Sequence, residues 1–110
     1  MYHQDLTAEK WAKLTLSEQL GNVGSEVSRM IKWRGKDNAI AERAFERMLE
    51  LMDLTLQSQT NGSRLREIAR SREMVVSSWL ENDKYTDSNL AYLNKYFLQF
   101  ALLACQHRII

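Results

Sequence analysis

The stretch from Asn89 to His107 limits the possible folds most, because its apolar side chains do not keep to one stripe. On a helix, at about 100° per residue, they cover one face and both of its flanks. They are Leu90, Tyr92, Leu93, Tyr96, Phe97, Leu98, Phe100, Ala101, Leu102, Leu103 and Ala104. A helix that is apolar nearly all round is covered on more than one side. We therefore expect it to occupy a central position or a subunit interface.

Composition favours long helices and one domain. The 110 residues include no proline and four glycines, as is typical of helices joined by short turns. The net charge of +1 excludes a strong overall attraction to nucleic acid, so any such contact needs a local patch. Cys105 is the only cysteine, which is typical of a reducing cytoplasm, and no stretch resembles a membrane span. We expect a cytoplasmic protein.

Apolar periodicity predicts four long helices with short connections. Thr15 and Glu18 have the spacing of a capping box at the start of the first. Gly35 is expected to end it, and Asn61-Gly62 is the clearest turn. The predicted helices span residues 16–34, 39–57, 64–81 and 89–107, the second capped by Asp37 or Asn38 and the last by Asp87 or Ser88.

The predicted fold is all-α, an antiparallel up-down-up-down four-helix bundle over residues 15–110. Residues 1–14 form a short, partly ordered N-terminal arm, with a possible helix around 8–13 that Thr7 opens. In this arm Leu6, Trp11 and Leu14 could cover one end of the bundle.

Small residues form a second stripe on the first long helix, at Ser17, Gly21, Gly24 and Ser28. Two glycines inside a helix cost about 1 kcal/mol each relative to alanine, so close approach of another backbone is expected to compensate. That neighbour is either a helix of the same bundle or a partner, which could be a subunit or a nucleic acid.

Polar faces are predicted on the first two long helices. Trp33 projects with Asn22, Glu26 and Arg29, where it either covers the helix end or serves as an exposed anchor for a partner. The second helix has a solvated face made of Glu42, Arg43, Glu46, Arg47, Glu50 and Asp53.

The third helix combines an apolar arc with the most basic segment, RLREIARSR. Arg72 lies within the arc, so it is expected to form a buried ion pair with Glu26, Glu50 or Asp53. The arc is predicted to bury Leu65, Ile68, Ala69, Val75, Val76, Trp79 and Leu80.

Arginines outside that arc form the candidate nucleic-acid-binding residues, namely Arg64, Arg66 and Arg70. Arg66 and Arg70 share an outer face with Ser77, a geometry that could follow a phosphate backbone. The alternative is an ordinary solvated face, with Glu67 and Glu73 balancing its charge.

The residues that would carry chemistry form no constellation. Cys105 and His107 point to different faces of a helix, and the chain has no Glu-x-x-His, no Cys-x-x-Cys and no glycine-rich phosphate loop. We therefore expect no catalytic residue, no metal site, no cofactor and no small-molecule substrate.

Three segments carry a family resemblance: LTLSEQLGNVGSEVSRMIKWR, AFERMLELMDLT and KYFLQFALLA. With the pattern Trp-x-Lys-Leu-[ST]-Leu at Trp11–Leu16, they resemble a group of small bacterial helical-bundle proteins. The architecture is loosely similar to the four-helix-bundle family of ribosomal-RNA intervening sequences, which includes accessory proteins of diversity-generating retroelements. The resemblance implies a ring-shaped oligomer that binds a reverse transcriptase and its RNA.

Two hypotheses of function follow. In the first, the protein is a non-catalytic, oligomeric accessory subunit that contacts nucleic acid through the three arginines beside a reverse transcriptase. In the second, it is a protein–protein interaction scaffold without nucleic-acid binding. For its interface with protein we predict Trp33, Tyr92, Tyr96 and Leu103.

Overall fold

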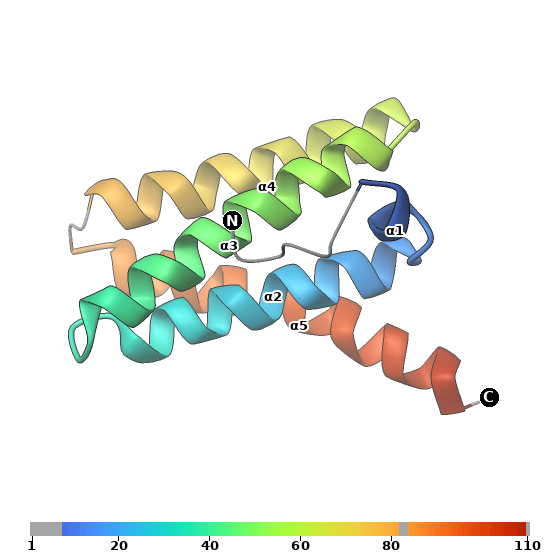
Figure 1. The fold of residues 1–110 in the computed structure, drawn as a ribbon. Helices are drawn as coiled ribbons and strands as arrows, with labels where there is room; N and C mark the ends of the chain where they lie inside the picture. Colours follow the sequence, from blue (N-terminus) through green and yellow to red (C-terminus); the bar gives the residue numbers. More distant parts are fainter. Residues whose placement is uncertain (1–7, 82–83, 110) are drawn as a thin grey trace.

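The computed structural model describes residues 8–81 and 84–109, and the regular structure in these ranges is entirely helical (Figure 1). The helices are α1 (Ala8–Ala12), α2 (Leu16–Trp33), α3 (Asn38–Ser58), α4 (Gly62–Glu81) and α5 (Thr86–Ile109). None of them combines the length and the apolar character that crossing a membrane requires. Leu6 and Thr7, which we placed in the N-terminal arm, lie outside the described residues.

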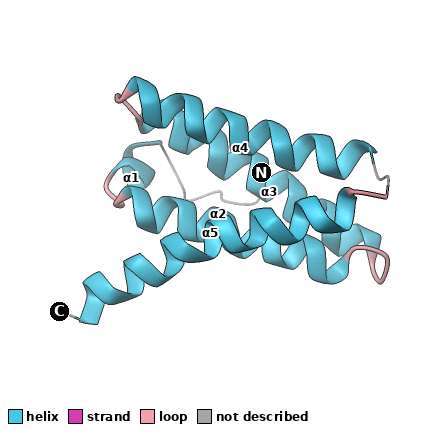
Figure 2. Ribbon diagram, turned by 180° about the vertical axis from the view of Figure 1, so that it is seen from behind, coloured by secondary structure: helices cyan, strands magenta, loops and turns pink. Residues whose placement is uncertain are grey.

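Helix α2 lies at the centre of the molecule, with α3 on one side and α5 on the other. Helix α4 contacts α3 and α5, and α1 lies against α3 (Figures 1 and 2). The core includes Leu20, Val23, Val27, Met30, Ala44, Met48, Met52, Ile68, Val75, Leu90, Leu93 and Phe97. The sequence predicted a central position or a subunit interface for α5; within the molecule it is not central, and its C-terminal end projects away from the other helices (Figure 2).

The caps predicted for α2 and α3 and the turn predicted at Gly35 are present, and the helix ends lie within one residue of the predicted ones. Thr15 and Glu18 form a complete capping box: each backbone amide donates to the other residue's side chain. Gly35 follows α2 with φ +80°, a conformation that glycine adopts without steric cost. Asp37, one of the two candidates, caps α3 by accepting hydrogen bonds from the amides of Ala39 and Ile40.

The glycines of the small-residue stripe let α2 and α5 approach closely. A Cβ atom added at Gly24 would lie 2.7 Å from Cβ of Phe97, and one added at Gly21 would lie 3.1 Å from Cα of Ala101. Both distances are shorter than ordinary van der Waals contact. Of the two predicted roles for this stripe, the structure therefore gives these glycines tight packing within the molecule.

Helix α1 is fixed to the core through Trp11, whose side chain is 3% exposed. Its indole N–H donates a 2.9 Å hydrogen bond to the hydroxyl of Thr55, which in turn donates to the Leu51 carbonyl. The side-chain amide of Gln19 donates to the Trp11 carbonyl at 2.9 Å. Residues 8–14 are therefore more closely integrated than the predicted arm.

Two features of α4 differ from expectation. The helix begins at Gly62, because the Asn61 side chain accepts from the amides of Ser63 and Arg64. Its buried face contains Ile68, Ser71, Val75 and Ser78, so two small polar residues occupy the helix contact. Leu65 and Leu80, which were predicted to be buried, lie off this face and are exposed. Trp79 does pack inward, where it stacks on Phe45 of α3.

Helix α5 begins at Thr86, ahead of both predicted cap residues. Asp87 accepts a 2.7 Å hydrogen bond from Arg34 at the end of α2, so it pairs with a guanidinium instead of capping the helix. This contact joins the C-terminal end of α2 to the N-terminal end of α5.

Candidate interaction surfaces

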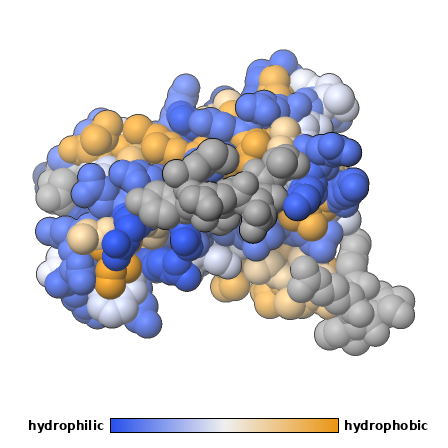
Figure 3. Space-filling model, viewed as in Figure 1, coloured by the Kyte–Doolittle hydropathy of each residue, from blue (hydrophilic) through white to orange (hydrophobic). Residues whose placement is uncertain are grey.

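Helix α5 exposes apolar side chains on two flanks. Leu98 and Leu102, four residues apart, are 53% and 56% exposed and lie on the side facing α2. Tyr92 and Leu103 are 62% and 42% exposed and share the other flank, and Tyr92 lies next to α4. Hydrophobic colours gather over the end of α5 that extends beyond the other helices (Figure 3). This helix therefore carries the uncovered apolar surface that its sequence predicted.

We call the flank of α5 that carries Tyr92, Tyr96 and Leu103 the tyrosine flank. Tyr96 is half-buried, and its ring packs edge-on against those of Phe97 and Phe100. Its hydroxyl donates a 2.6 Å hydrogen bond to Glu67 of α4. Burial, together with the adjacent Glu67 carboxylate, raises the pKa of the Tyr96 phenol. The side chain is thus a neutral donor held in one orientation.

A small cavity of about 130 Å³ lies between α4 and the tyrosine flank. Arg70 and Met74 of α4 line it opposite Tyr92 and Tyr96. Arg70 and Met74 also line a neighbouring groove with Ser77, as expected if these residues share an outer face. The structure thus brings one predicted nucleic-acid-binding residue next to two predicted interface residues.

The other two predicted arginines of α4 are also exposed. Arg64 is close enough to Tyr96 to act on it electrostatically, and the Arg66 guanidinium lies near Gly62. Glu67 and Glu73 lie among these arginines, as expected for the alternative of a balanced, solvated face. The α4 surface is thus exposed and basic, with carboxylates interspersed.

Arg72 forms the ion pair that was predicted, but the pair is not buried. Its Nε donates a 3.0 Å hydrogen bond to Asp53 of α3, one of the three candidate partners. The two side chains are 32% and 53% exposed. The apolar arc of α4 is wider than its buried face, which places Arg72 at the edge of the helix contact, where solvent screens the pair.

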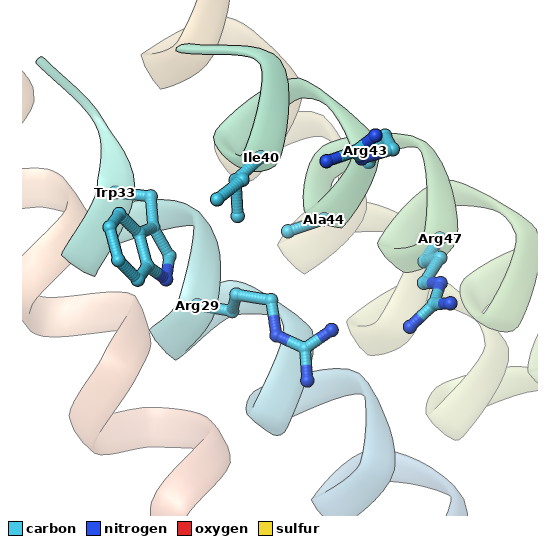
Figure 4. Close-up of a pocket in the computed structure, with 6 residues that line it drawn as sticks. All are labelled: Arg29, Trp33, Ile40, Arg43, Ala44 and Arg47. Atoms are coloured by element: carbon cyan, nitrogen blue, oxygen red, sulfur yellow. The ribbon is translucent and has the colours of Figure 1, made fainter. Parts of the chain in front are cut away.

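A groove between α2 and α3 was not predicted. We call it the α2–α3 groove; it has a volume of about 280 Å³ and is lined by Arg29, Trp33, Ile40, Arg43, Ala44 and Arg47 (Figure 4). Trp33 therefore does not share the tyrosine flank with the other predicted interface residues. It is half-buried at the edge of this groove, with the Lys32 ammonium 5.5 Å from its ring centroid.

Beside the groove, the polar faces of α2 and α3 meet instead of both facing solvent. Glu26 is buried, with one carboxylate oxygen 3.6 Å from Arg29 and 3.8 Å from Arg47 across the helix contact. Its other oxygen is buried and accepts no hydrogen bond from the described residues. The sequence contained one signal for this contact: the polar face of α2 carries the carboxylate of Glu26, and the polar faces of both helices carry arginines.

Comparisons with known proteins identify no relative: no protein-family model, curated protein or solved structure matches this chain. Its function is therefore inferred from the geometry of the three surfaces described above and from the residues that line them.

Proposed function

We propose that the protein is a non-catalytic accessory subunit that assembles with further copies of itself through the tyrosine flank of α5. The observation that carries this proposal is the exposure of Tyr92 and Leu103 on the same flank of α5 as the fixed ring of Tyr96. Tyrosines held in place before binding are frequent anchors of protein interfaces. Soluble monomers rarely leave large contiguous apolar patches uncovered, and most oligomers consist of identical subunits.

The proposal includes the up-down-up-down order of an antiparallel four-helix bundle. It is supported by the contacts of α2 with α3 and α5, by those of α4 with the same two helices, and by short connections at residues 34–37 and 59–61. Short connections favour antiparallel neighbours. Cytoplasmic location is proposed as well, because the lone, exposed Cys105 suits a reducing compartment.

Light scattering in solution tests the assembly. We expect the native chain to form a defined oligomer and the pair Tyr92→Lys and Leu103→Lys to yield a folded monomer, because two charges would be buried without partners. Leu98→Lys and Leu102→Lys, on the other flank, are the matched control and should retain the oligomer. A monomeric native protein, or dissociation by the control pair alone, would contradict the proposal.

A second candidate function is nucleic-acid binding by the same subunit, through Arg64, Arg66 and Arg70. It is favoured by the exposure of all three arginines on α4, since guanidinium groups on a solvent-facing helix surface can contact phosphates of a nucleic acid. The family resemblance would then make the partners a reverse transcriptase and its RNA. Without this activity, the subunit would be a scaffold for protein alone.

Salt-dependent binding of a short structured RNA distinguishes the two functions. We expect binding to weaken as salt increases, and Arg66→Gln with Arg70→Gln to reduce the slope of log K against log salt by about one for each arginine that meets a phosphate. Leu80→Gln, an exposed substitution on the same helix, should leave the slope unchanged. RNA binding that is absent or independent of salt would leave the scaffold as the function.

A further inference from the structure

We propose that the α2–α3 groove binds a nucleotide unit, with the phosphate held by Arg29 and Arg43 and the base against Trp33. The groove is formed by other helices than the tyrosine flank and the arginines of α4. The inference therefore does not depend on the function proposed above. Its ligand could be a free nucleotide or one residue of a single RNA strand, because both offer the same phosphate and base.

Positive charge is concentrated in this groove. Among the described residues that line it, three are arginines and none is a carboxylate. Figure 4 shows the guanidinium groups of Arg29 and Arg47 pointing towards each other across the groove, with Arg43 above them on α3. Arginine side chains that converge in this way suit a phosphate, which accepts paired hydrogen bonds from a guanidinium.

The donors of Arg29 and Arg43 are available to a ligand. Arg43 is exposed and forms no ion pair with any carboxylate in the described part of the chain. Arg29 lies 3.6 Å from Glu26, a separation at which the charges attract but no hydrogen bond forms. The same Glu26 oxygen is 3.8 Å from Arg47, so Arg29 shares this carboxylate with a second guanidinium.

The rest of the groove provides an apolar wall. Trp33 contributes a flat aromatic surface, and Ile40 and Ala44 contribute aliphatic side chains beside it (Figure 4). Stacking on an aromatic ring stabilises any of the nucleobases, because each of them has a flat π face. The volume of about 280 Å³ lies just below the usual range of small-molecule sites, which suits a ligand portion as small as one nucleotide unit.

Nuclear magnetic resonance of the tryptophan indole N–H groups tests this inference on the whole chain. The three tryptophans lie in different environments: Trp11 donates to Thr55, Trp79 stacks on Phe45, and Trp33 lines the groove. We expect adenosine monophosphate to shift the Trp33 signal, which Trp33→Phe would identify, and to leave the other two in place. Adenosine at the same concentration should cause little shift, because it lacks the phosphate.

Arg43→Gln is the decisive variant, since its side chain is exposed and its loss should leave the fold intact. It should weaken the binding of adenosine monophosphate by about tenfold or more, as expected for the loss of a charge-assisted contact. The matched control is Lys13→Gln, an exposed cation at the opposite end of α2 from Trp33, which should leave the affinity unchanged. Circular dichroism would establish that both variants are folded.

The outcomes separate the two sources of the ligand. If a short single-stranded RNA shifts the Trp33 indole signal and Arg43→Gln abolishes that shift, the groove holds part of a strand. If only the mononucleotide shifts this signal, the ligand is a free nucleotide. No shift of Trp33 with either probe would overturn the inference. An equal shift with adenosine, or an affinity that Arg43→Gln does not change, would overturn it too.

Discussion

Gly24→Val is expected to lower the free energy of unfolding by about 3 kcal/mol, at the upper end of the cost of overpacking a core. Even the first atom of the new side chain would lie 2.7 Å from Cβ of Phe97. Cβ of Phe97 is bonded to the backbone of α5 and cannot rotate away, so the two helices would have to separate. Urea unfolding followed by circular dichroism measures the loss.

Three further glycine variants calibrate this result. Gly62→Ala should change the stability little, because the added Cβ would meet only the Arg66 guanidinium at 3.8 Å. Gly21→Ala, at 3.1 Å from the backbone of Ala101, should have an effect between those of Gly62→Ala and Gly24→Ala. At Gly21 and Gly24, which lie inside α2, alanine gains about 1 kcal/mol of helix propensity, which partly offsets the clash. A Gly24→Val protein as stable as the native chain would show that α2 and α5 do not approach as described.

Trp11→Ala is expected to lower the free energy of unfolding by about 3–5 kcal/mol, the range for removing a large aromatic side chain from a core. The substitution would leave a cavity next to α3 and remove the indole donor that bonds to Thr55. Because Trp11 is only 3% exposed, the space left by its side chain would be enclosed by the surrounding core. The shift of the urea midpoint measures the effect.

Trp33→Ala is the matched control, since the same side chain is removed from the edge of the α2–α3 groove, where it is half-buried. It should cost about 1 kcal/mol or less, as do most substitutions outside a core. Trp11→Phe keeps a ring in place and should cost less than Trp11→Ala, with about 1 kcal/mol of its effect due to the missing hydrogen bond. Equal effects of Trp11→Ala and Trp33→Ala would mean that residues 8–14 are an arm, as the sequence suggested.

Local signals in the sequence predicted the helices and several of their ends. The capping box at Thr15 and Glu18, the turn at Gly35 and the helical stripe of glycines each depend on residues close together in the chain. Each of these features can be predicted from a single helix, without knowledge of how the helices pack together. The face on which α4 packs could not be found in this way, because its apolar arc is wider than the contact and includes Arg72.

The α2–α3 groove was missed for a related reason. Each polar face, considered alone, has the composition of a solvated surface, and helical periodicity does not reveal that Glu26 of one helix faces Arg47 of the other. The buried carboxylate makes sense only once the relative rotation of the two helices is known. By contrast, the exposed flanks of α5 were evident from the sequence, since its apolar side chains exceed what one contact face can cover.

Helix α4 packs much less extensively against the rest of the molecule than α2 packs against α3 and α5. Its buried face includes Ser71 and Ser78, which contribute little to apolar burial. Detaching α4 would therefore disrupt far less of the core than detaching α2, and a protein opens most readily where opening exposes the least apolar surface. We therefore expect the helix that carries Arg64, Arg66 and Arg70 to have the lowest free energy of local opening among the long helices, so that its basic surface reorients while the α2–α3–α5 core stays folded.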